Sequence, residues 1–265
     1  MRLLLLALAL AASAQAQPTR TLADDDWCDG VERWGHAATE CEVRETVTRA
    51  GALDVRATNG SVTVKPWDRA DVLVRARVVA GAPDPAGARR LLADTDVVVE
   101  RGAVSAETPE TGRDRWVAVS FEVFAPASTD LDVTAMNGPV QVLGLRGRLR
   151  ADALNGPVSL RDVGGDVAVK ATNGPVEVVL DGPSWSGRGL SVAATNGPIT
   201  VNVPRGYSAR LTARTVNGHV SADGLRLPAR DRRWAGDEVE ATLGDGGAPI
   251  SLRAQNGPVR LRATG

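Results

Sequence analysis

Residues 171–178, "ATNGPVEV", belong to a short motif that recurs along the chain. Four close copies read "AMNGPVQV", "ALNGPVSL", "ATNGPITV" and "AQNGPVRL", and two looser ones read "ATNGSVTV" and "TVNGHVSA". The copies align on seven asparagines, which are Asn59, Asn137, Asn155, Asn173, Asn196, Asn217 and Asn256. Self-similarity of this kind is typical of folds built by stacking one small unit.

Apolar and polar residues alternate on both sides of each asparagine. In the copy at Asn155, the positions two, four and six residues earlier hold Ala153, Ala151 and Leu149, and Val158 follows three residues later. Such alternation is typical of a strand with one buried face. Each unit is therefore predicted to be a strand, a corner and a second strand.

A β-hairpin is the obvious alternative, because Asn-Gly between alternating apolar runs favours a two-residue hairpin turn. The proline after the glycine argues against it, because the residue that closes such a turn donates its backbone N–H and proline has none. Proline also drives the preceding glycine towards extended geometry. We therefore predict a corner between strands on different faces, with the glycine at positive φ. The proline occurs in five copies, as Pro139, Pro157, Pro175, Pro198 and Pro258.

The spacing of the copies predicts how the units stack. Three successive asparagines lie 18 residues apart, and the next gaps are 23 and 21 residues. The gap of 39 before Asn256 approximates two such steps, and the gap of 78 before Asn137 approximates four. The predicted fold class is all-β: a β-helix-like solenoid with about 18–23 residues per coil. Each coil would bury its apolar face against its neighbours.

Each asparagine lies an even number of residues after the apolar positions of its strand, and should therefore be on the same side of the strand. This parity predicts that the carboxamides point into the coil. A buried amide costs free energy unless it is hydrogen-bonded. Asparagines stacked on one another can bond along such a ladder. The alternative is that each asparagine is simply a turn residue with an exposed side chain. We favour the internal ladder.

Residues 1–16 are typical of a secretory signal peptide. They contain one arginine, a short Leu/Ala run and a small-residue cleavage site at Ala14–Ala16. The run is too short to span a bilayer, although a retained anchor is the alternative. No later segment is apolar enough to cross a membrane. We expect the mature chain to be exported, periplasmic or extracellular, and without a membrane span.

Residues 17–50 form an N-terminal segment that holds both cysteines, Cys28 and Cys41. In an oxidising compartment these two are expected to form a disulfide. The short loop that it closes would add about 3 kcal/mol of stability. A metal or redox pair is the alternative, but the spacing and a single nearby His36 match neither well.

Residues 51–130 are predicted to form a sheet with one short helix near residues 85–93. The stretches "DVLVRARVV", "DVVVERGAV" and "WVAVSFEVF" alternate like longer strands, and "PDPAGARRLLADT" has helix signals. This part is expected to cap the stack, because an open end would template aggregation. Residues 131–265 are predicted to be the solenoid with Asn-Gly-Pro corners. The last insertion contains a polar loop and then a strand, "EVEATLG".

The repeat and its flanks resemble the bacterial putative-adhesin family of exported β-strand-repeat proteins of unknown function, also called the toastrack domain. The matching stretches span roughly residues 40–265 and read "CEVRE", "LDVRATNGSVTVKPWDRADVLVRARV", "FEVFAPASTDLDVTAMNGPVQV" and "LGDGGAPISLRAQNGPVRLRATG". The resemblance implies a right-handed, single-chain β-helix-like stack. It implies no catalytic residues.

The sequence offers little enzymatic chemistry. His36 and His219 are its two histidines, and no phosphate loop, zinc-protease or serine-hydrolase motif occurs. The run "ADDDWCD" offers carboxylates for calcium, but a charge run is usually solvated, and solvation is the interpretation we favour. Glu238 and Glu240 share one strand face, as glycosidase carboxylates would, and ordinary solvation is the plainer interpretation. We expect no catalytic residue, metal or cofactor.

Outward-facing charges could contact anionic glycan or lipopolysaccharide, or simply confer solubility, which is the interpretation we favour. These residues are Arg150, Asp152, Lys170, Arg214, Arg253, Arg260 and Arg262. With a formal net charge of −1, no nucleic-acid partner is expected. Our hypothesis is a non-enzymatic, adhesin-like interaction module of the envelope or surface, whose unknown partner is an envelope glycan or a surface protein. The alternative is a polysaccharide-processing β-helix enzyme, a lyase or hydrolase.

Overall fold

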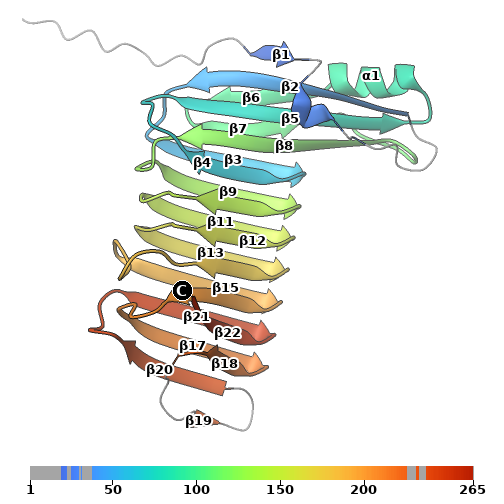
Figure 1. Cartoon of the computed structure of the whole chain (residues 1–265). Coiled ribbons are helices and arrows are strands. Elements are labelled where there is room, and N and C mark those ends of the chain that lie inside the picture. Colours follow the sequence, from blue (N-terminus) through green and yellow to red (C-terminus); the bar gives the residue numbers. More distant parts are fainter. Residues whose placement is uncertain are drawn as a thin grey trace, which may run out of the picture.

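Two eleven-stranded sheets, packed face to face around one core, make up a tall stack with a wider N-terminal end (Figure 1). The computed structural model describes residues 19–22, 25–29, 31, 38–225, 231–232 and 237–264. The predicted signal peptide at residues 1–16 and His36 lie outside these ranges. The fold class predicted from the sequence, an all-β solenoid, is confirmed.

Seven coils form the stack, and each is a strand of sheet B, a corner and a strand of sheet A. The sheet B strands are β3 (Ala52–Asn59), β9 (Asp130–Asn137), β11 (Arg148–Asn155), β13 (Asp166–Asn173), β15 (Gly189–Asn196), β17 (Ala209–Asn217) and β21 (Pro249–Asn256). Their sheet A mates are β4 (Val62–Pro66), β10 (Val140–Leu143), β12 (Val158–Arg161), β14 (Val176–Val179), β16 (Ile199–Pro204), β18 (Val220–Asp223) and β22 (Val259–Thr264).

Each strand of a coil pairs in parallel with the equivalent strand of the next coil, so the hairpin alternative is excluded. The motif stays in register throughout: Ala153 lies beside Ala171, and Asn155 beside Asn173. The alternating aliphatic residues consequently form continuous inward rows, in which Leu149 and its equivalents are almost fully buried. These Val, Leu and Ala rows are the core that the alternation predicted.

All seven corner glycines are required by space, and all except Gly218 also have positive φ. Gly156 has φ of +150°, and a Cβ added there would lie 2.2 Å from the carbonyl oxygen of Gly138 in the preceding coil. The Gly138 N–H donates to the Asn155 carbonyl (2.9 Å), and the Val140 N–H to the Pro157 carbonyl (2.9 Å). This pattern needs no donor from the proline nitrogen, which explains why proline is accepted at the corner.

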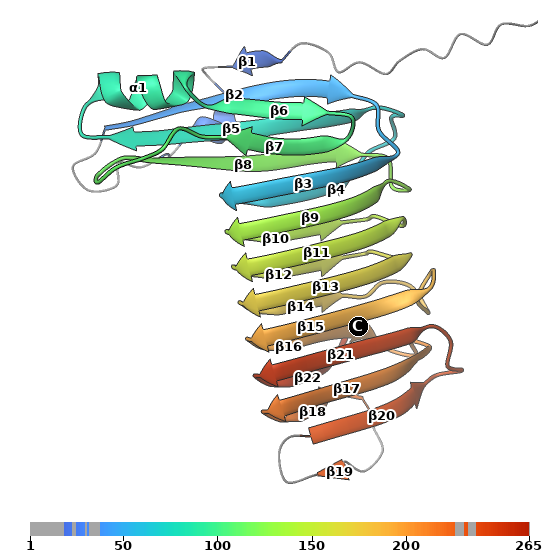
Figure 2. The same cartoon turned by 180° about the vertical axis from the view of Figure 1, so that it is seen from behind.

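The two long gaps between motifs are not multiples of a coil, so this prediction is wrong. β9 pairs directly with β3, which makes the coils of Asn59 and Asn137 immediate neighbours. At the other end, β21 lies between β15 and β17, and β22 between β16 and β18 (Figure 2). The spacing failed because it counts residues along the chain, and the chain can leave the stack and return to any adjacent position.

Residues that precede the first coil and residues between the first two coils together build the wider end. β5 (Val72–Ala82) pairs antiparallel with both β2 (Ala38–Thr48) and β8 (Trp116–Ala125), and β8 continues sheet A by pairing with β4. The helix α1 (Pro85–Ala93) has the predicted bounds and is capped by Asp84, which accepts from the Gly87 N–H. Smaller elements are β1 (Arg20–Leu22), which pairs with β2, and the 3-10 turn η1 (Asp26–Cys28).

The stretch "DVVVERGAV" is not one strand, as predicted, but the hairpin of β6 (Asp96–Glu100) and β7 (Ala103–Glu107). Arg101 (φ +49°) and Gly102 (φ +89°) both adopt left-handed conformations, which is the geometry of a tight hairpin turn. At the far end, β20 (Asp237–Leu243) pairs antiparallel with β17 and contains most of the predicted "EVEATLG" strand. β19 (Asp231–Arg232) pairs with β20.

Candidate interaction surfaces

The seven motif asparagines form one continuous ladder of side-chain hydrogen bonds. In six hydrogen bonds of 2.8–3.0 Å, the carboxamide N–H of one asparagine donates to the carboxamide oxygen of the next, and Asn59 at the end only accepts. The spatial order is Asn59, Asn137, Asn155, Asn173, Asn196, Asn256 and Asn217. The amide dipoles therefore all point the same way along the stack.

The prediction that this ladder lies inside the coil is wrong, because all seven asparagines are exposed. Parity places a side chain on the inner side of its own strand, but burial also requires the opposite sheet to cover it. At the corner the chain crosses from one sheet to the other, and no layer lies over the asparagine. The last covered row is that of Ala153 and its equivalents, two residues earlier.

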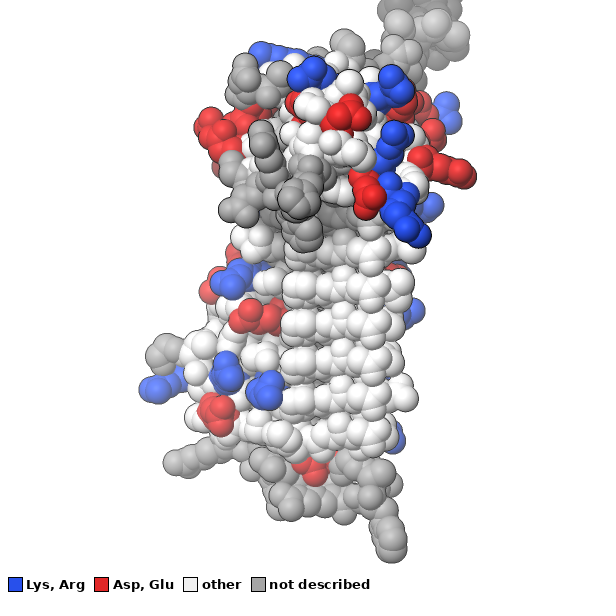
Figure 3. Space-filling model, turned by 90° about the vertical axis from the view of Figure 1, so that its right-hand side faces the viewer, with Lys and Arg blue, Asp and Glu red and all other residues white. Residues whose placement is uncertain are grey.

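The corners together make a surface without charge, which we call the corner face. It comprises residues 58–61, 136–139, 154–157, 172–175, 195–198, 216–219 and 255–258, none of which is Lys, Arg, Asp or Glu. Figure 3 shows these corners as uninterrupted white columns along the stack, while charged residues gather at the N-terminal end and on the flanks. His219, which replaces proline in one copy, is exposed on this face.

The exposed large apolar side chains of the described residues all belong to the corner face. They are Met136 (45% exposed), Leu154 (41%) and Val216 (40%), and each immediately precedes a ladder asparagine. Met136 and Leu154 lie on the neighbouring strands β9 and β11. Met136 and Leu154 therefore form one aliphatic pair beside the amide ladder, and Val216 lies apart from them at the end of the stack. The positions in between hold Thr172, Thr195 and Gln255.

The outward charges are scattered instead of forming a field of one sign. On the outer face of sheet B, one row across neighbouring strands contains both signs of charge and one uncharged residue. In spatial order it reads Asp152, Lys170, Ala193, Arg253 and Arg214. Arg260 and Arg262 lie on the other sheet. Glu238 and Glu240, the candidate glycosidase carboxylates, also resemble ordinary surface charges. Glu238 lies opposite Arg214 in the antiparallel β17–β20 ladder, and Glu240 is exposed.

An open cleft of about 1010 Å³ lies at the opposite ends of the strands from the corners. It forms where three connections meet: residues 49–51 between β2 and β3, residues 66–70 after β4, and residues 126–129 between β8 and β9. Backbone hydrogen bonds brace these segments, from Trp67 N–H to the Ala125 carbonyl (3.1 Å) and from Asp130 N–H to the Gly51 carbonyl (3.2 Å). The cleft is therefore preformed.

Trp67 and two arginines give this cleft its chemistry. The indole Nε1–H of Trp67 donates to the Asp71 carbonyl (2.8 Å). The guanidinium of Arg69 lies 4.6 Å from the Trp67 ring and donates two hydrogen bonds to the Asp71 carboxylate (2.9 and 2.7 Å). These bonds from Arg69 lower the pKa of Asp71, and the nearby charge of Arg49 lowers it slightly further. Sequence reasoning did not single out these residues.

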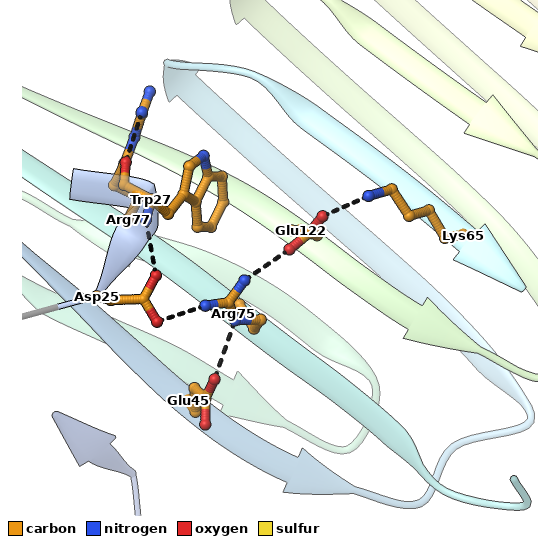
Figure 4. A network of polar contacts seen from close by, with 7 residues as sticks. All are labelled: Asp25, Trp27, Glu45, Lys65, Arg75, Arg77 and Glu122. Atoms are coloured by element: carbon orange, nitrogen blue, oxygen red, sulfur yellow. Dashed lines mark hydrogen bonds and ion pairs between the residues drawn. The ribbon is translucent and has the colours of Figure 1, made fainter. Parts of the chain in front are cut away.

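A second polar cluster clamps the N-terminal segment onto the wide end of sheet A (Figure 4). Arg75 of β5 binds three carboxylates, those of Asp25 (2.6 Å), Glu45 (2.9 Å) and Glu122 (2.9 Å). Glu122 also pairs with Lys65 (2.7 Å). Because every carboxylate of this cluster is already paired, it is suited to holding the structure together.

The same segment is anchored by a disulfide and by an aromatic ring. Cys28 and Cys41 are joined, with their Cα atoms 5.8 Å apart. The ring of Trp27 lies near the guanidinium groups of Arg75 (5.5 Å) and Arg77 (5.2 Å). Burial of Glu122 opposes its ionisation, but bonds from Lys65 and Arg75 outweigh that effect and lower its pKa.

Two further observations concern the described ranges alone. They contain no group of three or more His, Cys, Asp or Glu side chains arranged to hold a metal ion. They also contain no helix with the length and apolarity needed to cross a membrane.

Comparison with known proteins shows similarity only in overall shape. No family model matches the sequence, and no curated protein matches it. One similar solved structure is a putative cell adhesion protein from Clostridium sporogenes, with 10% identity, TM-score 0.46, and coverage of 84% of this chain and 100% of that one. Two others are a putative lipid binding protein from Parabacteroides distasonis (12%, TM-score 0.35) and a putative adhesin from Bacteroides fragilis (11%, TM-score 0.30), each covering 85% of this chain and 97% of the other. Similarity this weak carries no argument about function.

Proposed function

We propose that this protein is a non-enzymatic interaction module of the bacterial cell envelope or surface, which binds its partner by extended contact along the corner face. The partner surface is one without concentrated charge, because the corner face itself carries none. The disulfide between Cys28 and Cys41 supports an oxidising location, as the signal-like residues 1–16 do.

The observation that carries this proposal is the placement of the exposed apolar side chains. Scattered single exposed hydrophobics are normal on soluble proteins, but a concentration of them on one face marks an interaction site. Here all three exposed large apolar side chains of the described residues lie on the corner face, and two of them, Met136 and Leu154, are direct neighbours. The ladder beside them offers a repeating row of amide donors and acceptors.

Rigidity makes such a face effective in binding. Each corner is fixed by backbone bonds to the coils above and below, and by the amide ladder. A surface that is already ordered loses little conformational entropy on binding. Seven coils separated by about 4.8 Å give the face a length of about 29 Å.

A polysaccharide-processing enzyme remains the second candidate, because the cleft places arginines and a carboxylate beside a groove. Glycosidases need a carboxylic acid whose pKa is raised, so that it can donate a proton. Asp71 has the opposite property, because Arg69 lowers its pKa. This difference favours binding over hydrolysis at the cleft.

The proposal can be tested with two matched double variants and one panel of envelope glycans and surface proteins. Met136→Asp with Leu154→Asp places two charges on the corner face. Thr134→Asp with Ser191→Asp places two charges at exposed positions on the outer face of sheet B. We expect the first pair to weaken binding at least tenfold and the second to leave it unchanged.

Every polymer that binds should also be incubated with the wild-type chain and assayed for cleavage. Binding without turnover is the expected result. Turnover of any bound polymer would support the enzyme instead. Equal loss of binding in the two double variants would remove the corner face from the proposal, provided that both variants melt like the wild type.

A further inference from the structure

The cleft between residues 49–51, 66–70 and 126–129 has features that its structural role does not require. Its walls are fixed by backbone bonds, including one from Arg146 N–H to the Ala127 carbonyl (2.7 Å), which ties the third segment to the next coil. A site whose walls are already in place needs no reorganisation to receive a ligand.

One wall of the cleft presents flat, weakly polar surfaces. Trp67 is half-buried and cannot rotate freely, because its indole N–H is bonded to the Asp71 carbonyl and Arg69 covers part of its ring. Pro66 and Pro126 line the cleft beside it. Such surfaces suit the C–H face of a sugar ring, while Ser128 adds an exposed hydroxyl.

The cleft carries no excess positive charge, because Asp68 lines it and Asp71 is bonded to Arg69. What it offers an anion is the set of guanidinium donors that these carboxylates leave unused. Arg69 uses two of its donors on Asp71, which leaves the rest of its planar group available. Arg49 is exposed on the same cleft, and no residue in the described ranges forms a salt bridge with it. Arg49 and Arg69 both line the cleft. The charge of Arg49 also lowers the pKa of Asp71 slightly.

We propose that this cleft binds an anionic saccharide, with its acid group on Arg49 and Arg69 and its ring against Trp67. Guanidinium groups hold planar carboxylates and other oxyanions through paired, charge-assisted hydrogen bonds. The acid group can be the carboxylate of a uronic acid or a sulfate ester, since each offers a pair of anionic oxygens that can accept two hydrogen bonds from one guanidinium group. The site is separate from the corner face, so either proposal can fail without the other.

Calorimetric titration of the full chain with three oligosaccharides tests the site. The probes are an oligogalacturonate, a sulfated oligosaccharide of similar length and a neutral oligosaccharide. We expect at least one acidic probe to bind, with an affinity that falls as salt rises, and the neutral probe to bind at least tenfold more weakly. Comparison of the two acidic probes identifies the acid group.

Arg49→Gln is the decisive variant, because Arg49 is exposed and its loss should leave the fold intact. It is expected to weaken binding of the acidic probe about tenfold, which is the effect of losing one strong charge-assisted contact. The matched control is Arg56→Gln on β3, an exposed arginine whose partner Asp54 lies on the outer face of the sheet. This control should bind like the wild type.

The location of binding can be read from the indole N–H resonance of Trp67. The acidic probe should shift that resonance, assigned by its loss in Trp67→Phe. Absence of binding by both acidic probes would overturn the proposal. So would equal weakening by Arg49→Gln and Arg56→Gln, or binding that leaves the Trp67 resonance unmoved.

Discussion

The stacked coils and the antiparallel N-terminal strands share sheet A, yet they are held together differently. In the coils the stacking contacts recur from layer to layer, so that Ala153 lies beside Ala171 and Asn155 beside Asn173. In the N-terminal part each contact occurs once, as in the cluster around Arg75 or the Cys28–Cys41 disulfide. A repeated contact depends on its neighbours being in register, whereas a unique contact depends on its own partners.

This difference determines where each region is vulnerable. The coils should be sensitive to any change that separates one layer from the next, whatever its charge. The N-terminal clamp should be sensitive to charge and redox state, because it consists of ion pairs and a disulfide. The following predictions are arranged from the largest expected effect to the smallest.

Removal of the last coil should cause the largest change. A chain that stops at residue 247 lacks the coil formed by β21 and β22. Among the described residues, these two strands provide the only ladders that join the outermost coil, β17 and β18, to the rest of the stack. We expect β17, β18 and β20 to lose hydrogen-exchange protection while β2, β5 and β8 keep theirs. Protection of β17 in the shortened chain would show that it can dock without the missing coil.

Gly156→Ala should be the most damaging single change in a corner. The added Cβ would lie 2.2 Å from the Gly138 carbonyl oxygen at a φ that alanine rarely adopts, and such strain costs about 3 kcal/mol. The melting temperature should fall by roughly 2–4 °C for each kcal/mol. Gly51→Ala is the control, because nothing lies within 4 Å of its added Cβ and its φ is not positive. Equal melting of the two variants would contradict the close stacking of corners.

Asn155→Ala should have a smaller effect, because the ladder is exposed. Asn155 donates to Asn137 and accepts from Asn173, whereas Asn217 at the end of the ladder makes one such bond. Each bond contributes about 0.5 kcal/mol at an exposed position. Chemical unfolding should therefore show about twice the loss for Asn155→Ala that it shows for Asn217→Ala. A reversed ranking would argue against the ladder as a source of stability.

Acid should loosen the N-terminal clamp before it affects the corners. The Trp27 backbone N–H and Arg75 lower the pKa of Asp25, and Lys65 and Arg75 lower that of Glu122 against the effect of burial. Carboxylates with depressed folded-state pKa values stabilise the fold above their unfolded pKa of about 4, and lose this contribution as pH falls through the folded value. Hydrogen exchange around residues 25–28 should rise below about pH 4. Glu122→Gln should reduce this dependence.

The coils could be predicted from the sequence because alternation and repetition are local properties. The alternation around Asn155 located both strands of its coil, and the proline after Gly156 distinguished a corner from a hairpin. The burial of the asparagines could not be predicted, because parity carries no information about what covers a side chain. The "DVVVERGAV" hairpin could have been recognised from Arg101–Gly102, which offers a turn within the alternating run.

The two candidate sites differed in how far the sequence revealed them. Every residue of the corner face belongs to the motif, so its lack of charge was visible, but its exposure was not. The cleft assembles Arg49, Trp67 and Ser128 from three connections that lie far apart in the sequence. No local pattern marks such a group, because it exists only once the strands are paired.

The placement of β21 and β22 between earlier coils gives this chain an unusual order of assembly. During synthesis, β15 and β17 both emerge before the strand that must separate them. Because all coils share one motif, premature pairing of β17 with β15 would be a kinetic trap during folding. The segment before β17 nevertheless contacts the segment before β15, because the Ser208 N–H donates to the Pro183 carbonyl. The neighbouring Tyr207 is buried in the core. β21 and β22, which are synthesised last, then complete the stack by pairing between the two coils that flank them.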